Sequence, residues 1–178
     1  MWKKLPLNRE TIDADPKHVG AHLNLGTIYH TQGKFNHAIM SYKKVILIKP
    51  DYLEAHLNLG AVYRAQGNYE DAAKEYKEAI RIDPDDSMVH YNLGDIYYKQ
   101  GKTDQAIFQF KEVVRINPQD AEVHNILACF FSVNNQESLA IESLRNAIQL
   151  DITFRENAKT NVLFSNIRKN SKFQELVQ

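Results

Sequence analysis

The sequence predicts an all-α fold, an α-solenoid of stacked antiparallel helix pairs. A nine-residue segment recurs every 34 residues, and apolar and small residues between its copies follow helical spacing. Each interval is also divided at the same two points, by a turn residue and by a proline. Because an isolated helix pair cannot bury its apolar stripe, each pair is expected to pack against the next.

The recurring segment fixes where the helices should lie. AHLNLGTIY, AHLNLGAVY and VHYNLGDIY begin at Ala21, Ala55 and Val89, and a weaker copy, VHNILACFF, begins at Val123. Apolar positions at helical spacing predict two helices for each copy. We therefore expect helix pairs at residues 19–32 with 35–48, 53–66 with 69–82, 87–100 with 103–116, and 121–134 with 137–150.

Turn and stop residues separate these helices. Between the two helices of each pair stand residues that tolerate the left-handed backbone conformation ending a helix: Gly33, Gly67, Gly101 and Asn135. The second helix is followed by a proline in the first three copies, and proline opposes continuation of a helix. These prolines are Pro50, Pro84 and Pro118.

The pattern resembles the tetratricopeptide repeat (TPR) family over about residues 15 to 152. The signature sites of the first copy hold Leu25, Gly26, Tyr29, Ala38, Tyr42 and Pro50. The second and third copies match with Leu59, Gly60, Tyr63, Ala72, Tyr76, Pro84, and Leu93, Gly94, Tyr97, Ala106, Phe110, Pro118. The fourth copy departs at Ala128, Phe131, Asn135 and Ile152. It is still expected to fold as a hairpin.

These boundaries predict three regions: an N-terminal segment with a partial repeat (1–18), a four-repeat domain (19–152), and a capping helix with a tail (153–178). Phe154, Ala158 and Val162 continue a helical stripe. We expect the tail beyond Phe164 to fold onto the array, with binding to a partner as the alternative. An open N-terminal edge near Trp2 and Leu5 suggests that two chains could stack there.

Composition disfavours several classes of function. Lys plus Arg (22) equals Asp plus Glu (22), so no net charge attracts nucleic acid or an anionic membrane. Apolar runs are far too short for a membrane-spanning helix, and Pro6 and Glu10 interrupt any secretory signal. Cys129 is the single cysteine, which fits a cytoplasmic location. No motif for catalysis or for a cofactor is present.

A histidine recurs at one site of every copy: His22, His56, His90 and His124. Imidazole is a common metal ligand. However, equivalent sites on successive repeats lie about 10 Å apart, whereas a shared ion needs ligands within about 2 Å. We therefore expect structural packing and no metal site.

The resemblance to TPR proteins implies that the first helices line a concave face. Asn24, Asn58 and Asn92 share one position of that face, and the fourth copy has Ile126 there. An asparagine can both donate to and accept from one peptide unit. Spaced about 10 Å apart, the three would meet every third residue of an extended chain rising about 3.3 Å per residue. The arrangement resembles the asparagine ladder in the TPR superhelix of O-linked N-acetylglucosamine transferases.

Other side chains expected on this face would add affinity, because three hydrogen bonds alone give little. They are Leu23, Thr27 and His30 in the first copy, Leu57, Ala61 and Arg64 in the second, and Met88, Tyr91, Asp95 and Tyr98 in the third. The acidic residues Glu54, Asp95 and Glu122 argue against the carboxylate clamp with which some TPR proteins hold acidic chaperone tails.

The sequence thus predicts a non-catalytic protein–protein interaction module that binds an extended peptide segment. A self-assembling scaffold that associates through the ends of its repeats, and so forms a homo-oligomer, is the alternative. RNA binding is disfavoured by the 34-residue period and the zero net charge.

Overall fold

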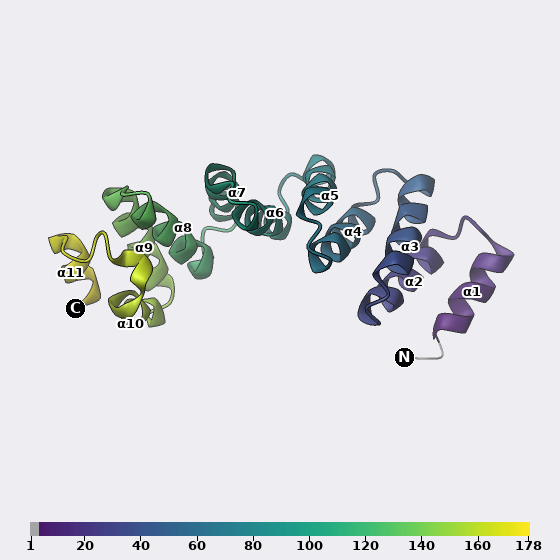
Figure 1. Cartoon of the computed structure of the whole chain (residues 1–178), viewed down its shortest axis with the longest axis horizontal. Coiled ribbons are helices and arrows are strands. Elements are labelled where there is room, and N and C mark those ends of the chain that lie inside the picture. Colours follow the sequence, from purple (N-terminus) through teal and green to yellow (C-terminus); the bar gives the residue numbers. More distant parts are fainter. Residues whose placement is uncertain (1–3) are drawn as a thin grey trace. The chain divides into compact units, whose positions relative to one another are not determined.

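The structure is a computed structural model that describes residues 4–178, with side chains described from Asn8 onward. The described residues form helices joined by short turns (Figure 1). They divide into two compact units, one ending at Gln100 and the other beginning at Gly101. Trp2 and the side chain of Leu5, where the sequence suggested an open edge, lie outside the described residues.

The first unit contains six helices among its described residues. They are α1 (Lys4–Ala14), α2 (Val19–Thr31), α3 (Phe35–Ile48), α4 (Leu53–Ala65), α5 (Tyr69–Ile82) and α6 (Ser87–Lys99). The hairpins α2–α3 and α4–α5 pack in sequence, since α1 contacts α2, α3 contacts α4, and α5 contacts α6.

The second unit continues the pattern and then departs from it. Its elements are α7 (Thr103–Ile116), α8 (Ala121–Val133), α9 (Glu137–Leu150), α10 (Thr153–Thr160), the 3-10 turn η1 (Val162–Phe164) and α11 (Ser171–Val177). The hairpin α8–α9 packs against α7. The predicted helices are all present. Each first helix ends one residue earlier than expected, and each second helix has the predicted bounds.

The turns adopt the backbone conformation that the sequence predicted. Gly33, Gly67 and Gly101 have φ of 69°, 74° and 72°, and Asn135 has φ of 57°. These values lie in the left-handed region, which a residue with a β-carbon enters at a cost. Asparagine is among the few side chains that tolerate it, so the fourth hairpin keeps the same turn.

The C-terminal tail caps the second unit. Phe164, Ile167 and Phe173 are 0 to 1% exposed, and η1 packs on α8 while α10 and α11 pack on α9. One expectation is wrong in detail: α10 ends at Thr160, and Val162 lies beyond it, 75% exposed. The apolar stripe of this helix therefore stops at Ala158, and the tail turns back at Asn161 to bury its own aromatic residues.

Helix α1 is in phase with the repeats that follow it. The Arg9 guanidinium donates to the Tyr29 hydroxyl at 2.9 Å. The residues 34 positions later, Lys43 and Tyr63, also meet, with the ammonium 5.9 Å from the ring centroid. Helix α1 therefore packs against α2 in the same way as α3 packs against α4.

Helix α1 nevertheless differs from α3 on the side that would face a first helix of its own. The α3 residues that pack there, Ala38, Tyr42 and Val45, are at most 1% exposed. The sequence positions 34 residues earlier hold the polar residues Lys4, Asn8 and Thr11. That side of α1 is therefore poorly suited to burial against another helix.

Candidate functional site

The first helices of unit 1 share one side. Helix α2 contacts α4, and Arg64 of α4 reaches Asn92 and Asp95 of α6. We call this side the ligand face and define it by Asn24, Thr27, Asn58, Ala61, Arg64, Met88, Tyr91, Asn92, Asp95 and Tyr98. It holds all three predicted asparagines, one on each helix. The three asparagines thus lie on three successive first helices of a single compact unit.

The asparagines differ in how their side chains are engaged. Asn24 is exposed, while Asn58 and Asn92 are half-buried. The Oδ1 atom of Asn92 accepts from Arg64 Nη1 at 3.4 Å, longer than a typical hydrogen bond. Among the described residues, Asn24 and Asn58 have no side-chain hydrogen bond. Two of the three amide groups are thus available as both donors and acceptors.

The ionic groups of the ligand face neutralise one another. Asp95 accepts from Lys99 Nζ through both carboxylate oxygens at 3.1 Å, and Arg64 Nη1 lies 3.7 Å from its Oδ2. These side chains are 24 to 42% exposed, so the pairs contribute little to stability. The face therefore presents no strong field that would select a highly charged ligand.

Apolar contact area on the ligand face is concentrated on α6. Met88 and Tyr98 are 70% and 60% exposed, and Tyr91 is half-buried. Leu57 of α4, also predicted for this face, is half-buried and is not among the residues that define it. Spacing along α6 puts Met88, Tyr91, Asp95 and Tyr98 on one side of the helix. This end of the face offers a ligand the largest apolar side chains.

Two residues predicted for the ligand face serve the packing of the hairpin. Leu23 is only 8% exposed and leaves little surface for a ligand. The Thr27 hydroxyl donates to the Leu23 carbonyl at 3.1 Å and accepts from the Tyr42 hydroxyl at 3.2 Å. Burial raises the pKa of Tyr42, so this phenol stays protonated as the donor.

The recurring histidines form a structural latch that the sequence did not reveal. In every repeat the histidine Nε2 lies 2.8 to 3.0 Å from the carbonyl oxygen of the proline six residues before it. A carbonyl can only accept, so Nε2 carries the proton and donates. Each bond ties the start of a first helix to the preceding turn. The constant six-residue offset was visible in the sequence, but only the fold shows that it brings the two groups together.

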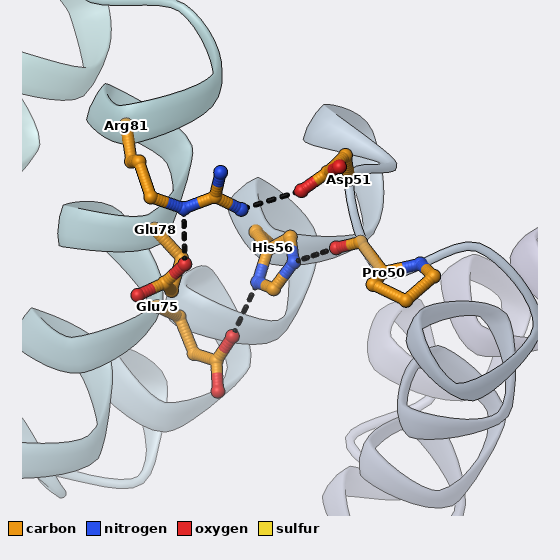
Figure 2. Close-up of polar contacts among 6 residues, drawn as sticks. All are labelled: Pro50, Asp51, His56, Glu75, Glu78 and Arg81. Atoms are coloured by element: carbon orange, nitrogen blue, oxygen red, sulfur yellow. Dashed lines mark hydrogen bonds and ion pairs between the residues drawn. The ribbon is translucent and has the colours of Figure 1, made fainter.

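The second repeat extends this latch into a polar network (Figure 2). His56 Nδ1 lies 2.7 Å from Glu75 Oε2, while its Nε2 lies 2.8 Å from the Pro50 carbonyl oxygen. Arg81 bridges Glu78 of its own helix and Asp51 of the turn after α3. The network joins α4, α5 and that turn, and none of these groups belongs to the ligand face.

Other chemistry finds no support in the described residues. No group of three or more His, Cys, Asp or Glu side chains there could hold a metal ion. None of the helices in that part of the chain is long and apolar enough to cross a membrane. Burial raises the pKa of the Cys129 thiol to about 11, with a weaker opposing effect from Asn161. A thiol in that state is a poor nucleophile.

Family models cover more than half of the chain. The TPR repeat model matches residues 26–66 and 62–101, and the tetratricopeptide repeat model matches residues 87–120. Among curated protein sequences, none matches the chain significantly.

Solved structures show the same fold. The crystal structure of YrrB, described as a TPR protein with an unusual peptide-binding site, is similar with a TM-score of 0.79 and 16% identity, over 95% of this chain and 88% of that one. A crystal structure of MamA gives a TM-score of 0.77 and 22% identity, over 85% and 89% of the two chains. The MamA RS-1 ArsTM double mutant gives 0.76 and 18%, over 84% of each.

Proposed function

Because the chain belongs to the tetratricopeptide repeat family, whose members generally serve as non-catalytic interaction modules, we propose that it binds an extended segment of a partner protein. The ligand face of α2, α4 and α6 is the site. The observation that carries this proposal is the row of Asn24, Asn58 and Asn92, one on each first helix of unit 1.

The asparagine row suits recognition of a main chain. A carboxamide complements the N–H and C=O of a peptide unit, so the contact makes no demand on the ligand's side chains. The donor and acceptor groups of the Asn24 and Asn58 side chains are both available. Asn92 retains its amide donors, while its side-chain oxygen accepts from Arg64. A segment following all three residues would be bound first through its backbone.

Side chains at the α6 end would set the preference among ligands. Met88 and Tyr98 are the most exposed apolar residues of the ligand face. Tyrosine recurs at binding hot spots because it buries a large apolar area at low entropic cost. We expect ligands with an apolar or aromatic residue at the position that reaches α6. The crystal structure of YrrB, a TPR protein described by its peptide-binding site, supports peptide binding as a use of this architecture.

The cellular setting that fits this proposal is the cytoplasm, where a lone thiol stays reduced. A partner protein is the expected ligand, and no cofactor or nucleic acid is required. The alternative, self-assembly through the repeat ends, gains no support from α1. The polar residues Asn8 and Thr11 stand where α3 has buried Tyr42 and Val45.

Peptide selection tests the proposal directly. A phage library of random nine-residue peptides would be selected on the purified protein, and the affinity of a selected peptide measured by fluorescence anisotropy. Changing Asn24, Asn58 and Asn92 together to alanine should weaken binding at least tenfold, since each lost hydrogen bond contributes about 0.5 to 1.5 kcal/mol.

The matched control carries Asn36→Ala and Asn157→Ala, two exposed asparagines away from the ligand face. It should bind like the wild type. Circular dichroism should show that both variants keep their helices. Equal affinity for the wild type and the triple variant, or a library that yields no binding peptide, would refute the proposal.

A further inference from the structure

Helix α3 carries an apolar stripe on its exposed side. Met40 and Leu47 are 72% and 74% exposed, the largest exposed fractions among the large apolar side chains that the structure describes in unit 1. They are seven residues apart, so they lie two turns apart on the same side of the helix. The equivalent residues of α5, 34 positions later, are Lys74 and Arg81. The repeat pattern therefore does not require apolar residues at these sites.

The charge around this stripe is of one sign. Residues 33–50 contain four lysines, Lys34, Lys43, Lys44 and Lys49, and no aspartate or glutamate. In the described part of the chain none of these lysines forms an ion pair, although Lys43 lies over the Tyr63 ring and interacts electrostatically with Asp71. Lys43 and Lys44 follow Met40 by three and four residues and therefore flank the stripe. The exposed side of α3 is both apolar and basic.

The matching side of α5 shows the usual solution for a solvated helix. Lys74 pairs with Glu70 and Asp71, and Arg81 pairs with Glu78 and Asp51. Exposed charges of both signs keep such a surface soluble and leave no contiguous apolar patch on it. Helix α3 lacks both the charges at the stripe and the acidic partners. Two exposed apolar residues and four lysines without an acidic residue on one short segment are typical of a docking surface.

We propose that the exposed side of α3 docks an acidic amphipathic helix of a partner protein. Two apolar side chains of such a helix, seven residues apart, would contact Met40 and Leu47. Carboxylates beside them would pair with Lys44 and, in competition with its contact to the Tyr63 ring, with Lys43. The two interactions reinforce each other, because apolar contact excludes water from the flanking ion pairs.

The flanking helices favour a narrow partner over an anionic lipid surface. Both α1 and α3 contact α2, and Arg81 of α5 reaches the turn after α3. The exposed charged residues of the flanking helices are of both signs: Arg9, Glu10 and Asp13 on α1, and Glu70, Lys74, Lys77, Glu78 and Arg81 on α5. The excess of positive charge is therefore confined to α3, which a helix about 10 Å wide would cover by itself, whereas a bilayer would also cover the balanced surfaces beside it.

This docking surface is separate from the ligand face. Its residues lie on a second helix, and the asparagine row lies on first helices. Either proposal can therefore fail without affecting the other.

The test uses a fluorescein-labelled 18-residue helical peptide with leucines at heptad positions and glutamates beside them, titrated against the whole protein. The variant Met40→Lys/Leu47→Arg gives α3 the residues of α5 and keeps good helix formers. It should bind the peptide at least tenfold more weakly than the wild type. Lys44→Glu, which copies Glu78 of α5, should also weaken binding, and added salt should reduce the wild-type affinity.

Two controls make the result specific. Phe108→Lys removes an exposed apolar residue at the equivalent position of α7, where 59% of the side chain is exposed, and should leave the affinity unchanged. A peptide of the same composition with its leucines spread around the helix should bind weakly. The proposal is overturned if wild type and Met40→Lys/Leu47→Arg bind the peptide equally, if neither binds it, or if phosphatidylserine vesicles bind the wild type more tightly than the peptide does.

Discussion

The first two repeats and the fourth repeat meet the same packing requirement with different pairs of side chains. In the first two repeats a glycine of the first helix lies under a tyrosine ring of the second. A β-carbon added to Gly26 would lie 2.5 Å from the Tyr42 ring, and one added to Gly60 would lie 2.9 Å from the Tyr76 ring. The equivalent residues of the fourth repeat, Ala128 and Leu144, are both fully buried.

This difference teaches that the two positions are constrained as a pair. A large ring on the second helix leaves no room for a methyl group on the first, whereas the smaller leucine is accompanied by an alanine. Protein interiors are packed so densely that one added methyl group lowers stability unless a neighbouring side chain becomes smaller. A larger residue on one helix therefore goes with a smaller residue on the other. The fourth copy departs from the family signature on both sides of the contact and keeps its hairpin.

The largest effect is expected when this pairing is broken. Gly26→Ala would place a methyl group 2.5 Å from the Tyr42 ring, so the helices must separate or the ring must leave its rotamer. Overpacking of this kind costs about 1 to 3 kcal/mol, and contact with a rigid ring puts the expected cost near the upper end. The loss should appear as a lower midpoint in urea unfolding followed by circular dichroism.

The double variant Gly26→Ala/Tyr42→Leu copies the fourth repeat and sharpens the comparison. It should recover more than half of the lost stability, although it also loses the bond from the Tyr42 hydroxyl to Thr27. A double-mutant cycle isolates the coupling between the two positions. If the two losses simply add, the positions are not constrained as a pair.

The helices and their turns were predictable because they depend on local chemistry. Helical spacing, Gly67 at a left-handed turn and Pro84 after a second helix each act within a few residues of the sequence. The engagement of individual side chains was not predictable. Whether Asn92 is free or held by Arg64 depends on how α4 and α6 lie, and no local pattern records it. The same holds for Val162, where a helical spacing continued past the point at which the chain turns back.

The histidine latch offers a second comparison between the same repeats. His56 is 5% exposed and bonds both Glu75 and the Pro50 carbonyl, whereas the equivalent His124 is half-buried. His56→Leu should destabilise the protein by about 2 kcal/mol, because it removes the two hydrogen bonds of a buried imidazole, to Glu75 and to the Pro50 carbonyl. His124→Leu should cost about 1 kcal/mol, since it removes one such bond, to the Pro118 carbonyl, from a half-buried side chain.

Urea unfolding of the two variants measures this difference. Glu75→Gln provides the control, because glutamine can still bond His56 while the carboxylate is lost. It should be less destabilising than His56→Leu. Equal losses for the two histidine variants would show that the latch to proline contributes the same in both repeats and that Glu75 adds nothing.

The smallest effects are expected at the turns. Gly67 has φ of 74° and open space where a β-carbon would lie, so Gly67→Ala tests backbone strain alone. It should cost about 1 kcal/mol.

Asn135→Gly makes the reverse exchange in the fourth repeat. It should change stability by less than about 0.5 kcal/mol, because glycine accepts φ of 57° without strain and asparagine already tolerates it. Thermal and urea unfolding of both variants would show which of the two loses more stability. A larger loss for Asn135→Gly than for Gly67→Ala would mean that the asparagine side chain stabilises its turn through its contact with Asn166, whose Nδ2 donates to Asn135 Oδ1 at 3.1 Å.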